Sequence, residues 1–385
     1  MRGSLKLFTW FGIPVHLHWT FGLIFVYALW IGYSNNLDII STVWLIGFFI
    51  ALFGCVLLHE YGHSLTARRY GVETRDIILT PIGGIARLER MPEKPIQEFL
   101  VAIAGPLVNV VIAAVLFLLS MLIFQGERWE LFKWFLKSQF LFSGGEEAGE
   151  VMEETGASMS GILFYLPVLV ATNIGLVVFN LIPAFPMDGG RIFRSLLAMR
   201  IGRVKATRAA ALVGQVIAVI FIVVGVLNWE KASTLTLIGF FVFITARTEN
   251  SMVRLDDILR RFKARDLLRP HFTRLTTNDW MQTPIEMLQH GLERSFLVFD
   301  LSDKLIGALE EADILEAIKK RDFSAEITQY VQRAELVDAE ESLQYVYHLM
   351  RQRGHSILAV VSGSELVGVI DEAGFQQFMR LKTTK

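Results

Sequence analysis

Long apolar runs separated by short polar segments dominate the first 250 residues of the chain. Each run is close to the ~20 residues that an α-helix needs to cross the hydrocarbon core of a bilayer. The pattern predicts six membrane-spanning helices, and we expect a polar, net acidic loop at 125–159 outside the membrane core. The expected spans cover roughly 16–34, 41–67, 97–124, 160–182, 206–228 and 233–248.

A different pattern, IILTPIGGIARLE, follows the second span and alternates around Gly83 and Gly84. It predicts a short β-hairpin. Unpaired backbone cannot face lipid, so such a hairpin must lie in a protein-lined cavity or at the membrane interface. Its exposed edge could pair with an extended peptide, although an ordinary surface turn would give the same pattern.

The pattern changes again after Arg247. The apolar residues of RLDDILRRFKAR, 254–265, share one helical face, and we expect an amphipathic linker on the anionic leaflet. Beyond it, SFLVFDLSDKLIGALEEADIL at 295–315 aligns without gaps with SILAVVSGSELVGVIDEAGFQ at 356–376. Neither copy buries its apolar face alone, so the two should pack as a pair. The expected domains are 1–250, a linker at 251–265, and 266–385.

Composition supports a membrane protein. Hydrophobic residues make up 53% of the chain and charged residues 19%, against about 25% in soluble domains. The formal net charge of −1 offers no argument for nucleic-acid binding. Cys55 is the single cysteine, so an internal disulfide and a zinc finger are excluded, and its place in an apolar helix indicates packing.

Loop charge predicts the orientation of the spans. Lys and Arg gather at the N-terminus and after the second and fourth spans, whereas the loops at 35–40 and 229–232 are not enriched in them. By the positive-inside rule, both termini and the C-terminal domain lie in the cytoplasm of a multi-pass protein of the cell membrane. His16 and His18 flank the first span, where interfacial histidines are favoured over metal ligands.

The candidate chemistry begins with HEYGH at the end of the second span. In this H-E-x-x-H spacing, His59 and His63 lie one helical turn apart on one face and can bind a single metal ion. Glu60 beside them can hold and deprotonate a water molecule. The motif alone arises by chance in solvated helices, but ionisable groups inside an apolar helix are costly and are functional candidates by default.

A catalytic zinc site commonly has three protein ligands, so one more is needed. Asp188 is the best candidate, because it is a lone acid beside a span and on the same predicted side of the membrane. Pro186 stiffens the backbone before it, and Gly189 and Gly190 permit close approach after it. Asn180 could donate a hydrogen bond to an oxyanion or to substrate backbone, or it could be a capping residue.

HEYGH together with NLIPAFPMDGGR resembles the site-2 protease family of intramembrane zinc metalloproteases, peptidase M50. Asn180, Pro183, Pro186, Asp188 and Gly189–Gly190 reproduce the family's N-x-x-P-x-x-P-x-D-G-G segment. The resemblance covers about 1–250. It implies one Zn²⁺ on both histidines and the aspartate, and catalysis by the motif glutamate. It also implies a membrane-embedded hairpin, which PIGG at 81–84 fits, and substrate binding by the hairpin glycines and by both prolines.

The C-terminal repeat resembles a tandem CBS domain. CBS pairs often bind adenine nucleotides, with an aspartate that holds the ribose; Asp313 occupies that place in the first copy, and Gly374 in the second. At most one nucleotide site is therefore expected. A ligand-free structural or docking module fits equally well, and the partner expected at this domain is a second copy of the chain in a homo-oligomer.

These observations predict an α-helical polytopic membrane protein with a small membrane-associated β-hairpin or sheet and a soluble α/β tandem CBS domain. The function expected is an intramembrane zinc endopeptidase that cleaves a membrane-spanning protein near the cytoplasmic face, with the CBS pair as a regulator. A metal transporter is the alternative from another class, but it requires neither the motif glutamate nor the Asp188 segment. An inactive substrate-binding scaffold is the third.

Overall fold

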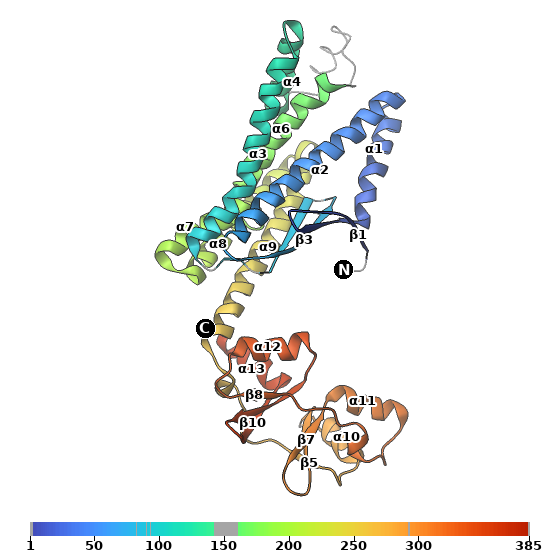
Figure 1. The fold of residues 1–385 in the computed structure, drawn as a ribbon, viewed down its shortest axis with the longest axis vertical. Coiled ribbons are helices and arrows are strands. Elements are labelled where there is room, and N and C mark those ends of the chain that lie inside the picture. Colours follow the sequence, from blue (N-terminus) through green and yellow to red (C-terminus); the bar gives the residue numbers. More distant parts are fainter. Residues whose placement is uncertain are drawn as a thin grey trace. The chain divides into compact units, whose positions relative to one another are not determined.

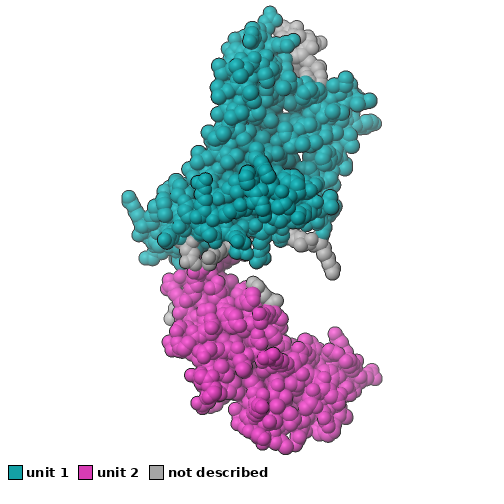
Figure 2. All heavy atoms as spheres, in the orientation of Figure 1, with its two compact units in different colours: residues 1–250 teal, residues 251–385 magenta. Residues whose placement is uncertain are grey.

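The computed structural model describes residues 3–81, 83–89, 91–92, 94–141, 161–291 and 293–383. The chain forms two compact units, Met1–Asn250 and Ser251–Lys385 (Figure 2). Residues 142–160, the larger part of the expected acidic loop, lie outside the described residues. The part before them was expected to be loop, but Glu127–Leu141 is helix α4, which packs on α6 through Phe132 and Val170.

Helices make up most of the first unit (Figure 1). Among the described residues, four helices are long and apolar enough to cross a membrane: α2, α3, α6 and α8. They correspond to the second to fifth expected spans. The first expected span holds a shorter apolar helix, and the sixth lies within α9. The helices are α1 Gly22–Ser34, α2 Ile39–Arg68, α3 Pro95–Ile123, α4 Glu127–Leu141, α6 Ile162–Asn180, α7 Asp188–Ile201, α8 Arg203–Leu227 and α9 Trp229–Arg261, with a 3-10 turn at Trp19–Phe21.

A four-stranded sheet accompanies the helices, in the order β1-β2-β3-β4 (Ser4–Trp10, Ile13–His18, Thr74–Thr80 and Gly83–Leu88). The predicted hairpin is confirmed by the antiparallel pairing of β3 with β4, in which Ile78 lies opposite Ile85. Strand β2 pairs parallel to β3 and antiparallel to β1. Strand β4 is therefore one edge of the sheet.

The prediction that residue 16 begins a membrane helix was wrong. Residues 13–18, IPVHLH, alternate in the two-residue period of a strand, and Ile13 and Val15 point into the core with 1% and 0% exposure. His16 Nδ1 lies 3.5 Å from an Asp76 carboxylate oxygen, and His18 Nδ1 lies 2.7 Å from the Thr20 hydroxyl. These contacts agree with a structural role for both histidines.

The second unit contains two similar halves, as the repeat predicted. Each half has a three-stranded sheet with one parallel and one antiparallel pair. Leu297 and Phe299 of the first half pack with Ile357 and Ala359 of the second in one apolar cluster. The elements are β5 Arg274–Thr276, α10 Gln282–Gln289, β6 Phe296–Phe299, β7 Leu305–Leu309, α11 Glu311–Lys320, β8 Leu336–Asp338, α12 Leu343–Gln352, β9 Ile357–Ser362, β10 Glu365–Asp371 and α13 Glu372–Thr383, with 3-10 turns at Ala264–Asp266 and Ile327–Gln329.

The expected linker is part of this second core. Residues 254–261 continue helix α9, and Leu259 is 4% exposed in a cluster with Leu343 and Val346 of α12. Leu255 and Phe262 pack against the same cluster. The apolar face that was expected on the lipid leaflet therefore contacts protein. Helix α9 begins in the first unit and ends in the core of the second.

Candidate metal centre

Helix α2 brings His59 and His63 to the same face, as their four-residue spacing requires. Both are buried, with 7% and 8% exposure. Their imidazole rings lie 4.7 Å apart between centroids and nearly perpendicular, and the two Nε2 atoms are 3.1 Å apart. Each histidine therefore presents the same nitrogen to one point.

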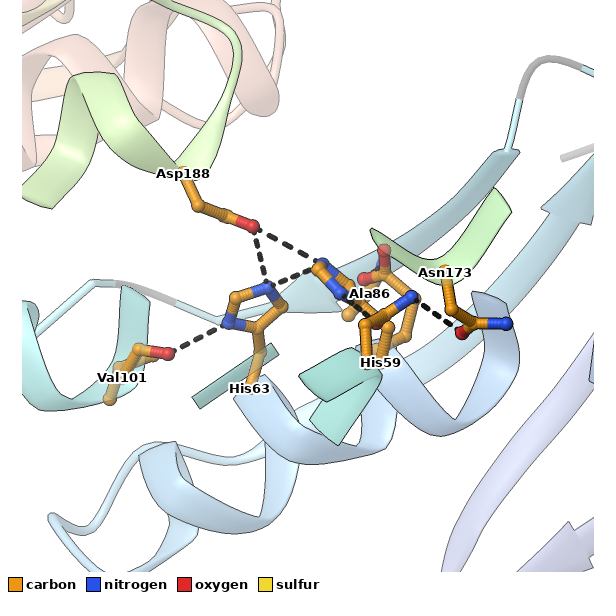
Figure 3. A network of polar contacts seen from close by, with 8 residues as sticks. His59, His63, Ala86, Val101, Asn173 and Asp188 are labelled. Atoms are coloured by element: carbon orange, nitrogen blue, oxygen red, sulfur yellow. Dashed lines mark hydrogen bonds and ion pairs between the residues drawn. The ribbon is translucent and has the colours of Figure 1, made fainter. Parts of the chain in front are cut away.

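Asp188 reaches that point from the first turn of α7, 125 residues beyond His63. Its Oδ2 atom lies 3.2 Å from His59 Nε2 and 3.1 Å from His63 Nε2 (Figure 3). The two glycines that follow allow the helix to start against its own preceding loop. A Cβ atom at Gly189 would lie 2.3 Å from the Ile182 carbonyl oxygen, and one at Gly190 would lie 2.7 Å from Ala184 backbone.

The far side of each imidazole is held by a hydrogen bond. The backbone carbonyl of Val101 can only accept, so His63 donates its Nδ1–H to it over 2.7 Å. His59 Nδ1 lies 2.7 Å from Oδ1 of Asn109, whose amide nitrogen donates to Asn173 Oδ1 at 3.1 Å. Since that amide nitrogen already faces Asn173, the oxygen receives the His59 Nδ1–H. Both Nε2 atoms are thus left with lone pairs, the form that binds metal.

Two further observations fit a metal ion. Separations of 3.1–3.2 Å among the three ligand atoms approach the edge of about 3.4 Å expected for a tetrahedral zinc site with bonds of about 2.0–2.1 Å. Gly105 on α3 leaves the space beside them open, because a Cβ there would lie 2.2 Å from His63 Nε2 and 2.7 Å from His59 Nε2. Two neutral imidazoles and one carboxylate form a donor set that suits zinc.

The Glu60 side chain extends from α2 to the edge strand of the sheet, β4. Its Oε2 accepts a hydrogen bond of 3.1 Å from the backbone N–H of Ala86 on β4. A side chain at Gly84 would collide with it, because a Cβ there would lie 2.6 Å from Glu60 Cγ. The hairpin therefore approaches the motif glutamate through a residue without a side chain. Gly84, one of the two glycines predicted to bind substrate, therefore lies against the Glu60 side chain.

An ion pair also connects strand β4 of this hairpin to strand β3. The Arg87 side chain donates through Nε to Asp76 Oδ1 over 2.6 Å and also pairs with Oδ2. These hydrogen bonds hold the pKa of the Asp76 carboxyl below its ordinary value. The carboxylate therefore stays ionised and keeps β4 in register beside the centre.

Comparison with known proteins identifies the family of the chain. The profile of peptidase family M50 matches residues 47–224. Over its whole length, the chain is 30% identical to zinc metalloprotease MJ0392 of Methanocaldococcus jannaschii and covers 98% of that protein. The chain belongs to peptidase family M50.

This M50 peptidase is also similar to a second zinc metalloprotease, to a site-2 protease of known structure and to a CBS domain pair. It is 28% identical over 403 residues to the putative zinc metalloprotease sll0528 of Synechocystis, with 97% of this chain and 94% of that one covered. Among solved structures, the site-2 protease from Methanocaldococcus jannaschii is 34% identical, with a TM-score of 0.42 over 64% of this chain and 95% of that one. The CBS domain pair of protein MJ0100 is 18% identical, with a TM-score of 0.29 over 31% of this chain and 98% of that one.

The other predicted residues of the peptidase lie at the end of α6, in the loop before α7 and at the start of β4. Asn180 is the last residue of α6 and is half-buried. Pro183 and Pro186 lie in the loop before α7, where the second is exposed. Gly83 begins β4. The roles of these residues in substrate or oxyanion binding stay predictions.

Sequence reasoning missed the residues that orient the ligands. Asn109 and Asn173 are 0% exposed, lie in apolar helices α3 and α6, and form a chain that ends at the Leu169 carbonyl. A buried amide in a membrane helix needs a partner, so each asparagine was a detectable signal. The Val101 carbonyl and the space at Gly105 carry no such signal, because they depend on how α3 packs on α2.

Proposed function

We propose that this M50 peptidase hydrolyses a peptide bond of a membrane-spanning protein with zinc held by His59, His63 and Asp188. The observation that carries the proposal is the convergence of their three ligand atoms within 4.8 Å of one another, on two helices, α2 and α7, that are far apart in sequence. The locked Nδ1–H groups support the same assignment, since they leave both Nε2 atoms ready to coordinate.

The zinc ion would supply Lewis acidity, which makes water nucleophilic near neutral pH and polarises the scissile carbonyl. Glu60 acts as general base: its carboxylate takes the proton of the attacking water and returns it to the leaving amine nitrogen. The hydrogen bond from Ala86 N–H keeps that carboxylate beside the hairpin rather than free to swing away. Asn180 is the proposed donor to the oxyanion or to substrate backbone.

The substrate would bind as an extended strand. Strand β4 is an edge of the sheet, and Gly84 brings that edge against Glu60 without a side chain between them. An added strand pairs by main-chain hydrogen bonds, which a helical substrate cannot offer until it unwinds. Gly83, Gly84, Pro183 and Pro186 form the proposed binding segment. Gly or Pro in the substrate would ease unwinding.

Orientation and partners complete the proposal. Loop charge supports a cytoplasmic position for both termini and the C-terminal unit, and cleavage near the cytoplasmic face. The tandem CBS unit is proposed as the regulator and as a contact for a homo-oligomer. Its candidate nucleotide ligand Asp313 lines a cavity of about 360 Å³ together with Tyr330 and Gln332.

Asp313 is already engaged in two contacts. Its Oδ2 accepts from the Glu310 backbone N–H at 3.0 Å and its Oδ1 from Gln332 Nε2 at 2.6 Å. A ribose must therefore share or displace the glutamine. Calorimetry of the full chain with AMP, ADP and ATP tests the site. Binding that Asp313→Asn abolishes would support it, and the absence of heat with all three nucleotides would refute it.

The test of catalysis is Glu60→Gln, with co-expressed single-span membrane proteins as substrates. We expect zinc to stay bound and every cleavage product of the wild type to disappear, because the amide cannot accept the water proton. Glu73→Gln is the matched control, since it makes the same change at an exposed site on the turn before β3. Products formed by Glu60→Gln at the wild-type rate would remove the residue from the mechanism.

A further inference from the structure

One charged side chain of the first unit is more deeply buried than any metal ligand. Arg194 on α7 is 1% exposed. Its Nε donates to Glu98 Oε1 of α3 at 2.8 Å, and its Nη1 to Glu249 Oε1 of α9 at 2.5 Å. Its guanidinium carbon also lies 5.0 Å from the centre of the Phe185 ring. A buried charge persists only where partners compensate its desolvation, so this cluster ties three helices together at one point.

The contact with Glu98 connects two halves of the metal centre. Glu98 is itself 1% exposed and lies in the first turn of α3, three residues before Val101. The Val101 carbonyl accepts the His63 Nδ1–H. Arg194 therefore joins the helix that orients His63 to the helix whose first residue is Asp188. Within a rigid helix, the six residues from Asp188 to Arg194 span about 9 Å, so the spacing of α3 and α7 sets the position of the carboxylate.

Helix α9 contacts the loop that leads into Asp188. Val242 packs with Ala184 and Met187, and Ala246 packs with Phe185. The neighbouring Thr245 hydroxyl oxygen lies 3.3 Å from the Phe185 carbonyl oxygen and 2.8 Å from the Phe241 carbonyl oxygen of its own helix.

Glu249 continues this face of α9. Positions 242, 245, 246 and 249 follow the spacing of one helical face. The loop that leads into Asp188 thus lies against α9. The ion pair between Arg194 and Glu249 lies at the C-terminal end of this contact.

We propose that Arg194 is a positioning residue for Asp188, and that Glu249 makes the position of this carboxylate respond to α9. The inference rests on the proposed zinc site. With both carboxylates bound, Arg194 holds Asp188 within reach of His59 and His63. When α9 moves and Glu249 is withdrawn, the tie between α7 and α9 is lost, the Asp188 carboxylate is held less firmly, and zinc dissociates faster.

The first experiment measures zinc affinity of the full chain in detergent by competition with a chelator. Arg194→Gln with Glu98→Gln leaves a neutral amide pair in place of the two buried ions. The remaining partner, Glu249, has a side chain 32% exposed, so its carboxylate stays in contact with solvent. We expect the zinc dissociation constant to rise at least tenfold. Arg200→Gln, an exposed position in the same helix, should leave it unchanged. Lower thermal stability with unaltered zinc affinity would indicate a merely structural pair and overturn the proposal.

The second experiment tests the connection to α9 and does not depend on the first variant folding. Glu249 has a side chain 32% exposed, so Glu249→Gln leaves no fully buried group alone. We expect zinc to leave several-fold faster, and no additional loss when this change is combined with the double variant. Glu230→Gln, at the exposed start of α9, is the control. Unchanged zinc release by Glu249→Gln, or additive effects, would refute the coupling.

Both readouts are independent of proteolysis. Zinc retention is measured without substrate, so a failure to cleave would bear on the proposed function alone. Conversely, a peptidase that loses activity with Glu60→Gln but keeps its zinc affinity with Glu249→Gln would retain the function and lose this inference.

Discussion

A methyl group at position 105 would occupy the space in which the metal ligands converge. The Cβ atom of Gly105→Ala would lie 2.2 Å from His63 Nε2, 2.5 Å from His63 Cε1 and 2.7 Å from His59 Nε2, whereas ordinary contacts begin near 3.4 Å. The imidazoles would have to move by roughly 1 Å, and misplacement of that size costs about 100-fold in rate. We therefore expect zinc to be lost and cleavage to fall by at least that factor.

The expected cost is confined to the site. A rate loss of about 100-fold corresponds to about 2.7 kcal/mol of transition-state stabilisation. Measured against the zinc-free wild type, stability should not fall, because the three nearest atoms are histidine ring atoms, and alanine is favoured over glycine in a helix by about 1 kcal/mol. Loss of zinc with a melting temperature no lower than that of the zinc-free wild type is thus the signature of the clash.

The measurement is zinc content after dialysis against a chelator, together with cleavage of a co-expressed substrate and the melting temperature. Gly54→Ala provides the matched control, since it lies in apolar helix α2 and its added Cβ would meet nothing within 4 Å. A Gly105→Ala protein that retains zinc and cleaves at the wild-type rate would show that the ion does not lie where the three ligand atoms converge.

Three further substitutions separate the ligands from the groups that support them. Asp188→Asn should lower zinc retention because a neutral amide oxygen is a weaker ligand, and a full zinc complement would remove Asp188 from the ligand set. Asn109→Ala should raise the zinc dissociation constant about 10–100-fold by releasing the His59 ring, and chelator competition measures it. Gly84→Ala should slow cleavage with zinc retained, since its Cβ would lie 2.6 Å from Glu60 Cγ; wild-type cleavage would place the substrate elsewhere.

Local patterns of the chain were sufficient for much of this picture. Apolar runs of bilayer length indicated the spans, because backbone in lipid must be satisfied within each segment. The spacing of His59 and His63 placed both on one helical face without knowledge of the fold. Asp188 was identified from its unusual chemistry beside a span, and the repeat at 295–315 and 356–376 predicted paired halves. Each of these inferences depends on residues close together in sequence or on a single costly charge.

Only the tertiary structure decided how those parts are held. The strand at 13–18 is short, and its partner β3 lies some sixty residues away in the sequence. A search for apolar segments of bilayer length therefore joined the end of this strand to the helix that follows it. The Val101 carbonyl and the hydrogen at Gly105 become functional only through the packing of α3 on α2. Likewise, the residues of 254–262 have the same amphipathic pattern whether they face lipid or protein. Sequence periodicity states which face is apolar, whereas the partner of that face is set by contacts between distant segments.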